Sequence, residues 1–507
     1  AVMCPATGPD ELAWVRRLAA PTTAEAALLR SPMRPIVLVA ARADAPLSAA
    51  VAPGLAEVGV MLPYSPLHHL LLAALDRPLV ATSGNLSGEP VLTDAAAVEA
   101  RLGGVAQGFL HHDRPILRPA DDPVYRSLGE RPRPIRLGRG NAPLELALAR
   151  PLPRPTLAVG GHMKNAVALA WGSRVVISPH IGDMGTPRSL AVFEQVIADL
   201  QRLYGVTTRQ LVADAHPGYT TRRWAERAGL PVAHVHHHTA HASAMAFEHD
   251  PDARWLVYTW DGVGYGEDGT LWGGEALVGG PGRWQRAARL RPFRLPGGER
   301  AGREPWRSAA ALCWEAGREW AGVPAGGELL REAWARGVNA PVTSAAGRLF
   351  DGAAALAGLV LEASFEGQGP MMLEAACGSA RDAPVLPLVE TEGLVEIDWE
   401  PLLDPLMDAA RPVGERSALF HEALARALVA TARRLHARQP FDLVGLTGGV
   451  FQNAVLTRLA VAGLRDAGFA PRLVERVPPN DGGIAYGQIA EVAARAALSE
   501  DPPGGGA

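Results

Sequence analysis

The chain has 507 residues, of which 48% are apolar, and a formal net charge of −4. This length exceeds what one hydrophobic core serves, so two or three domains are expected, while the acidic balance argues against nucleic acid or an anionic membrane as a partner. Apolar runs stay well below the roughly 20 residues of a membrane span, and three dispersed cysteines without a CxxC pair exclude a zinc finger or disulfide framework and favour a cytoplasmic protein.

Residues 1–145 alternate short apolar runs with helical patterns, as in an α/β domain. The opening segment AVMCPATGPDELAWVRRLAA predicts the end of a strand followed by a helix. It lacks an initiator Met and a signal-peptide pattern, so we expect the sequence to begin inside a domain. Further along, RPIVLVA and RPLVATSG predict strands, and SPLHHLLLAAL predicts a helix. A stretch rich in proline and arginine, residues 131–155, then predicts a boundary between domains.

A second domain is expected over residues 155–495, followed by a disordered tail over residues 496–507. Its first part predicts a meander of three short strands, TLAVGG, NAVALAWG and RVVISPHIG, and then an amphipathic helix in SLAVFEQVIADLQRLYG. QLVADAHPG and PVAHVHHH predict strands on either side of a helix in TTRRWAERAG.

The same order of elements then starts again. A second meander is predicted by WLVYTWDGVGYG, GTLWGGEALVG and WQRAARLRPF, and a helix-rich stretch follows over residues 303–380. Strand–turn–helix units close the domain, around LTGGVFQN and PPNDGGIAYGQ. A duplicated β-β-β-α-β-α plan with glycine turns after strands resembles that of the actin/sugar-kinase/heat-shock ATPase (ASKHA) superfamily.

A histidine-rich segment, HVHHHTAH, lies at the start of a predicted helix. His237 and His241 are four residues apart, so their rings share one helix face, and neutral imidazoles at that spacing suit a metal ion. A histidine-rich surface turn is the alternative, and for this motif alone it is favoured.

Two aspartates strengthen the metal interpretation. Asp261 ends one predicted strand and Asp481 follows another, each with glycines directly behind it. Two histidines and two aspartates from separate element ends suit a hard or borderline divalent metal. For Asp261 alone, an ordinary hairpin turn is an equally good interpretation.

Glycine turns beside these residues predict an anion site. Gly262 and Gly264 follow Asp261, while a strand delivers Gly448 and Gly449 to a predicted helix start. Free N–H groups and the helix dipole favour negative charge there. Neither turn fits a Rossmann or P-loop pattern, and close packing of a strand on a helix is the alternative.

Lys164, in GGHMKN, is the only lysine, since every other one of the 49 basic residues is arginine. It lies in the turn of the first predicted meander. A compact ammonium enters a crowded polyphosphate site more readily than a planar guanidinium. Chance survival of one codon is the rival explanation.

The first domain carries weaker signals of the same kind. LVATSGNLSGEP places Ser83, Asn85 and Ser87 after a strand, where small donors suit phosphate or ribose. RPIRLGRGNAP supplies Arg136 and Arg139, which are able to pair with phosphate.

Together these motifs resemble one family closely, the HypF carbamoyltransferases of nickel–iron hydrogenase maturation. The resemblance covers nearly the whole chain, because the motifs follow one another in the family's order. Those in the first domain are APGLAEVGVMLPYSPLHHLLL, ATSGNLSGEP and HDRPILRPADDPV. Those in the second domain are GGHMKN, SPHIGDM, ADAHPGYTTRRWA, VHHHTAH, WDGVGYGEDGTLWGGE, FEGQGPMMLEA, LTGGVFQN and PPNDGGIAYGQ.

The resemblance implies a YrdC-like domain followed by a TsaD-like domain of the ASKHA fold. It implies an ATP-dependent, AMP-forming carbamoyltransferase that makes carbamoyl-adenylate from carbamoyl phosphate and ATP. The carbamoyl group would then pass to the C-terminal cysteine of a HypE-type partner, as the precursor of the cyanide ligands of the hydrogenase iron.

The resemblance also implies roles for individual residues. Zn or Fe would be bound by His237, His241, Asp261 and Asp481, and Mg would accompany ATP. The adenylate would contact Gly448, Gly449 and Asn453, and its phosphate would lie near Lys164 and Asn165.

The sequence departs from the family pattern in its first part. An acylphosphatase-like domain, paired CxxC zinc fingers and the first YrdC-like strands are missing, so we expect an N-terminally truncated member that makes the adenylate poorly. Two alternatives stay open: an O-carbamoyltransferase of a small molecule, a family that places the TsaD-like domain first, and a protein that only binds its partner. A tRNA threonylcarbamoyl enzyme is less favoured because no basic patch is present.

Overall fold

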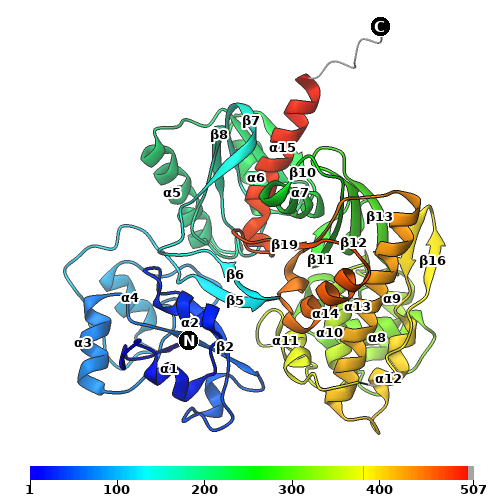
Figure 1. Cartoon of the computed structure of the whole chain (residues 1–507), viewed down its shortest axis with the longest axis horizontal. Helices are drawn as coiled ribbons and strands as arrows, with labels where there is room; N and C mark the ends of the chain where they lie inside the picture. The colour runs from blue at the N-terminus through cyan, green and yellow to red at the C-terminus, as the bar shows by residue number, and fades with distance from the viewer. Residues whose placement is uncertain (381, 501–507) are drawn as a thin grey trace. The chain divides into compact units, whose positions relative to one another are not determined.

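The computed structural model of the protein describes residues 1–380 and 382–500 (Figure 1). The chain divides into two compact units. One contains residues 1–235 and the C-terminal segment from residue 475, and the other contains residues 236–474. Among the described residues, no helix combines the length and the apolar character that crossing a membrane requires.

The first unit opens with a six-stranded mixed sheet in the order β4-β1-β3-β2-β5-β6. Burial alternates along its central strands, so Val37, Val39, Val58 and Val60 enter one hydrophobic core. This confirms the α/β prediction, although RPLVATSG supplies only two strand residues. The strands are β1 (Val2–Met3), β2 (Ile36–Ala40), β3 (Glu57–Met61), β4 (Leu79–Val80), β5 (Val124–Leu128) and β6 (Arg131–Arg136). The helices are α1 (Ala13–Leu18), α2 (Thr23–Arg30), α3 (Pro66–Leu75) and α4 (Ala95–Leu102).

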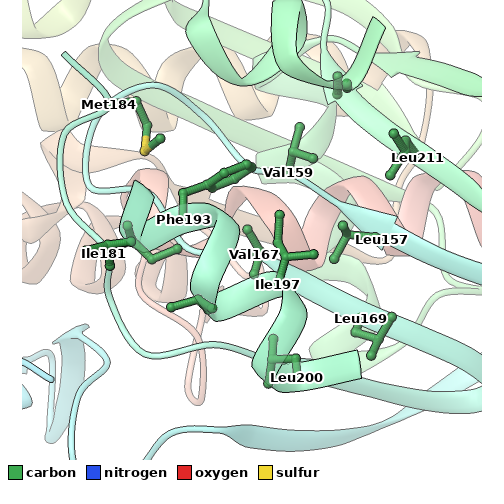
Figure 2. Close-up of a cluster of buried hydrophobic side chains, with 14 of the residues drawn as sticks. Leu157, Val159, Val167, Leu169, Ile181, Met184, Phe193, Ile197, Leu200 and Leu211 are labelled. Atoms are coloured by element: carbon green, nitrogen blue, oxygen red, sulfur yellow. The ribbon is translucent and has the colours of Figure 1, made fainter. Parts of the chain in front are cut away.

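A second sheet in this unit has the order β10-β9-β7-β8. Its strands are β7 (Leu144–Ala158), β8 (Ala168–Ile177), β9 (Gln210–Asp214) and β10 (Val232–Val235). The helices that accompany it are α5 (Pro187–Tyr204), α6 (Thr220–Arg227) and α15 (Ile484–Glu500). In Figure 2, Phe193 of α5 extends toward Val159, Ile197 lies beside Val167, and Leu200 lies near Leu169; together they build the core of this sheet.

The proline- and arginine-rich stretch predicted as a domain boundary is largely strand, since β6 and β7 occupy most of residues 131–155. One sequence prediction for this sheet is wrong. The meander of three short strands is instead one pair of long strands, because NAVALAWG and RVVISPHIG join into β8. In residues 131–155, prolines masked the hydrophobic alternation of the strands.

The second unit contains a nine-stranded sheet with the main path β16-β17-β13-β12-β11-β18-β19, and β14 and β15 at its side. β11 pairs antiparallel with β12 and parallel with β18. Its first strands confirm the predicted second meander, and helices fill the predicted helix-rich stretch. The strands are β11 (Trp255–Tyr265), β12 (Leu271–Gly279), β13 (Gln285–Leu290), β14 (Phe293–Arg294), β15 (Val342–Thr343), β16 (Leu388–Thr391), β17 (Leu394–Ile397), β18 (Leu443–Thr447) and β19 (Pro471–Leu473).

The helices of the second unit are α7 (His237–His249), α8 (Pro305–Glu315), α9 (Gly327–Ala335), α10 (Ala346–Leu356), α11 (Gln368–Ala375), α12 (Leu403–Met407), α13 (Val413–Arg438) and α14 (Ala454–Asp466). Helices α7 and α10 both pack on β11. These two helices therefore cover the strand that carries Asp261, one of the predicted metal ligands.

The predicted tail begins too early. Helix α15 continues through Glu500, so residues 496–500 are helical. The rest of the predicted tail, residues 501–507, lies outside the described residues.

Candidate metal and anion site

The histidine pair lies on the first turn of α7. His237 and His241 are both buried, and their ring centroids are 5.0 Å apart. Gly264 on β11 leaves room for the histidines, because a Cβ on it would lie 2.5 Å from the His238 ring and 3.0 Å from His237. The shared face predicted from the four-residue spacing is therefore present.

Asp261 faces the two histidines. It does not end its strand as predicted, because β11 continues to Tyr265 through an irregularity in register between Trp260 and Gly264. Its Oδ2 lies 3.2 Å from Nε2 of His237 and 3.1 Å from Nε2 of His241. Burial would raise the pKa of the Asp261 carboxyl, but the hydrogen bonds and charges of both histidines lower it well below its usual range.

The other oxygen of Asp261 is held by backbone. The N–H groups of Gly262 and Gly449 donate to Oδ1, at 2.8 and 3.1 Å. These hydrogen bonds fix the carboxylate and leave Oδ2 directed at the imidazoles. Fixing a ligand through its second atom is how proteins orient a metal site.

The donor set fits a divalent metal. The ligand atoms of His237, His241 and Asp261 lie within 4.8 Å of one another, and two imidazole nitrogens with one carboxylate oxygen suit Zn or Fe. Asp481, the fourth predicted ligand, belongs to the other unit, where it begins the 3₁₀ turn η5 (Asp481–Gly483). Its part in the site stays a prediction.

Two of the glycine N–H groups predicted to bind a phosphate donate hydrogen bonds to a side chain of the protein instead. Gly262 and Gly449 both donate to Asp261, so these two amides are already used. Gly448 has φ +99°, and a Cβ on it would lie 2.1 Å from the carbonyl oxygen of Trp260. Its role in this unit is the close approach of two strands.

The predicted helix start at Gly448 and Gly449 is also different. A 3₁₀ turn, η4 (Gly449–Gln452), comes first, and α14 starts at Ala454. The N–H of Ala454 donates to Oε1 of Glu374 at 2.7 Å. A carboxylate from the protein itself therefore takes the place expected for a bound anion.

Asn453 is likewise engaged. Its Oδ1 accepts from the N–H of Leu456 and caps α14, while Nδ2 lies 2.9 Å from Nε2 of His421. The other ring nitrogen of His421, Nδ1, lies 2.8 Å from the carbonyl oxygen of Ser417. This pairing assigns the proton to Nδ1 of a neutral imidazole, whose pKa is lowered by burial.

Lys164 lies in a turn held from two sides. It has a left-handed backbone with φ +46°, and its N–H donates to Oδ1 of Asp183 at 2.9 Å. Asn165 is fully buried, and its Nδ2 donates to the carbonyls of Val159 and Gly161. Asn165 thus shapes the loop that presents Lys164, and its place near a phosphate stays a prediction.

Most side chains of the first domain that were predicted to bind phosphate make hydrogen bonds within the protein itself. Arg139 donates to Asp122 and to two carbonyl groups, and its guanidinium carbon lies 3.1 Å from the ring centroid of Tyr64. Arg136 donates through Nε to the carbonyl of Asp122. Ser83 donates to Asn85, whose Nδ2 donates to two carbonyls of its own loop. Ser87 is exposed.

Sequence reasoning missed a buried charge cluster beside the histidines. Glu275 is fully buried, accepts from the N–H of Gly274, and forms an ion pair with Arg286 at 2.8 Å. Its Oε2 lies 3.7 Å from Nε2 of His238. The WGGE motif is the sequence signal that could have identified it, since a carboxylate directly after two glycines can bond their amides.

Comparison with known proteins gives three consecutive family matches. Residues 4–138 match the Sua5/YciO/YrdC model, described as "Telomere recombination". Residues 152–248 match "HypF Kae1-like domain", and residues 257–488 match "Carbamoyltransferase, Kae1-like Domain, second subdomain". The fold prediction, a YrdC-like domain followed by a TsaD-like ASKHA domain, is confirmed by these matches together with the structure.

Individual relatives agree. The chain is 40% identical over 94% of its length to "Carbamoyltransferase HypF" of Synechocystis sp., covering 65% of that protein. It is 35% identical to "Carbamoyltransferase HypF homolog" of Cupriavidus necator, with 67% of this chain and 92% of that protein covered. A solved structure, "full-length HypF in the phosphate- and nucleotide-bound form", superposes with a TM-score of 0.92 at 31% identity, covering 97% of this chain and 78% of that one.

The curated HypF relatives of Synechocystis sp., Rhizobium leguminosarum and Rhodobacter capsulatus are longer than this sequence, which spans 64–65% of their length. Within that span the family matches follow one another from residue 4 to residue 488, and the fold agrees with that of a solved HypF. The chain belongs to the HypF carbamoyltransferase family.

Proposed function

We propose that this chain acts in hydrogenase maturation by transferring a carbamoyl group from carbamoyl-adenylate to the C-terminal cysteine thiol of a HypE-type partner. The adenylate would derive from carbamoyl phosphate, ATP and water, with inorganic phosphate and pyrophosphate as the other products. The observation that carries the proposal is the geometry at Asp261, where one oxygen is fixed by backbone and the other faces two imidazoles, in a chain of the HypF family.

The transfer step balances without a nucleophile from this chain. The thiol sulfur of the partner forms a bond to the carbamoyl carbon, the bond from that carbon to the phosphate oxygen breaks, and AMP leaves with the oxygen. The thiol proton goes to solvent. Cys4 and Cys313 are buried, and burial raises the pKa of their thiols to about 12 and about 11, so neither suits the role of nucleophile.

His237, His241 and Asp261 would hold a divalent metal, Zn or Fe, with Asp481 as the proposed fourth ligand, and Mg would accompany ATP. The metal would supply Lewis-acid polarisation of the carbamoyl carbonyl. Nucleotide use is supported by the related full-length HypF, which was solved with phosphate and nucleotide bound. Lys164, on its hydrogen-bonded turn, would contribute a point charge to the phosphates.

A test is to supply synthetic carbamoyl-adenylate to the protein together with a peptide ending in cysteine, and to follow the peptide by mass spectrometry. We expect one carbamoyl group on the cysteine with wild type and little with His237→Ala. A matched control is His249→Ala, at the end of the same helix, where the ring bonds the carbonyl of Leu473. Transfer that is equal in His237→Ala would contradict the role of the site.

A small-molecule hydroxyl acceptor is the competing possibility. In the same assay it predicts no thiol product and a carbamate ester once a suitable alcohol is added. A protein that only binds its partner predicts neither product but an intact complex in pull-down.

A further inference from the structure

The first turn of α10 is a buried helix start that lacks a cap. Thr343 Oγ1 accepts from the N–H of Ala345, the residue before the helix, but Ala345 has no capping side chain for the N–H groups of the first turn. Ala345, Ala346 and Gly347 are all buried. A buried helix start without partners leaves N–H groups short of acceptors. This differs from α14, whose start is filled by Glu374 and Asn453.

The start of α10 lies directly against the metal-binding strand. A Cβ on Gly347 would lie 2.7 Å from the Cα of Gly262 and 3.1 Å from the carbonyl oxygen of Asp261. Only glycine permits this approach. The helix therefore presents its positive end beside the peptide that carries Asp261.

Arg348 adds a full charge at the same place. It is 9% exposed, and its Nε has no hydrogen-bond partner among the described residues. One end of its guanidinium is 2.8 Å from Oδ2 of Asp351, and the other would lie 3.8 Å from a Cβ on Gly262.

The partner of this cation, Asp351, is itself a buried carboxylate. Burial raises the pKa of its carboxyl to about 6, even though Arg348 opposes the shift. A buried guanidinium with one such partner retains a large desolvation cost. A second anion beside Gly262 would offset that cost.

We propose that Arg348 and the first turn of α10 bind the phosphate of the adenylate next to the metal site. The inference rests on the proposed function and adds a residue to it. The planar fork of arginine suits phosphate oxygens. As the bond between the carbamoyl carbon and oxygen breaks, the guanidinium stabilises the charge that collects on the departing AMP phosphate. The rival explanation is a purely structural Arg348–Asp351 pair.

Calorimetric titration with AMP and with adenosine separates the two explanations, since only AMP carries the anion. Asp351→Asn is the reference, because it keeps the guanidinium and removes the carboxylate. Arg348→Met/Asp351→Asn then removes the guanidinium without leaving a buried charge unpaired. Arg307→Met is the matched control, because Arg307 is also buried, lies on the adjacent α8 and pairs with Glu304.

We expect AMP affinity to fall about 10- to 100-fold between the reference and the double variant, the range for hydrogen bonds to a charged group. Adenosine affinity should change less than about twofold, and Arg307→Met should bind AMP like wild type. Arg348→Lys, which keeps the charge, should lose less than the double variant. Equal AMP affinity in the reference and the double variant, with thermal melts showing both folded, would overturn the proposal. A wild-type chain that binds neither probe would instead overturn the nucleotide chemistry on which it rests.

Discussion

The two carboxylate oxygens of Asp261 have different roles: one is fixed by the backbone, and the other is available to a ligand. Oδ1 accepts from the amides of Gly262 and Gly449, and Oδ2 is left to face His237 and His241. The sequence indicates a carboxylate near a histidine pair, because the motif spacings are local. It does not indicate the orientation, because Gly449 lies 188 residues further along the chain.

Lys164 is the residue whose replacement distinguishes a compact charge from a planar one. Because its φ is +46°, Lys164→Gly removes the side chain without adding backbone strain. We expect Lys164→Gly and Lys164→Arg both to weaken the binding of an ATP analogue by about 1.5–3 kcal/mol, as measured by calorimetry. If Lys164→Arg binds like wild type, the lone lysine has no special role.

His180 makes stability depend on pH. Burial, together with the charges of Arg136 and Lys164, lowers the pKa of its imidazole from 6.5 to about 4, although Asp183 opposes the shift. The unfolded chain binds the proton more readily, so the free energy of unfolding rises with pH between about 4 and 6.5 and is lost as pH falls through that window.

We expect His180→Gln to flatten this dependence by up to about 3 kcal/mol relative to wild type. Denaturant unfolding at pH 4.5 and pH 7 measures it. The same pH dependence in both proteins would show that other groups cause it.

At the scale of elements, β7 shows where periodicity is hard to see. Leu146, Leu148 and Leu152 are buried, as strand alternation requires. The prolines in RPLPRP fall where the register with β8 shifts, between Ala147 and Thr156, so they interrupt few ladder hydrogen bonds. From the sequence alone, those prolines argue against a strand, because the positions where the pairing with β8 is irregular are not known. The long, regular helix α5 was predicted correctly.

The turn from β18 into η4 depends on a glycine. In Gly448→Ala the new Cβ would meet the carbonyl oxygen of Trp260 at a position with φ +99°, so we expect a loss of about 2–4 kcal/mol in the free energy of unfolding. Gly468→Ala is the control, because φ is +85° there but no atom lies within 4 Å. Denaturant melts should give it only the backbone cost, about 1 kcal/mol. Equal losses in both variants would contradict the predicted clash.

At the scale of the whole molecule, the motif order predicted the succession of domains, and the family matches follow it from residue 4 to residue 488. The contacts that consume predicted anion-binding groups could not be predicted. Glu374 reaches the start of α14 across 80 residues of sequence, and no local pattern indicates such a contact. The motifs locate the site, but the fold decides which of its atoms are left for a ligand.

The engaged polar groups of the first domain lead to a prediction about adenylate formation. In the first domain, Arg139 and Asn85 are engaged by the protein itself. We therefore expect these 507 residues to give little ATP–pyrophosphate exchange dependent on carbamoyl phosphate. A full-length relative is the positive control. Robust exchange by this chain would show that it has all it needs to make the adenylate.

The central claim is that His237, His241 and Asp261 form a metal site, and metal analysis tests it most directly. Elemental analysis of purified protein should give about one Zn or Fe per chain for wild type and for His249→Ala. The double variant His237→Ala/His241→Ala should retain almost none, while its thermal melt shows that it is folded. Equal metal content in the wild type and the folded double variant would contradict the account.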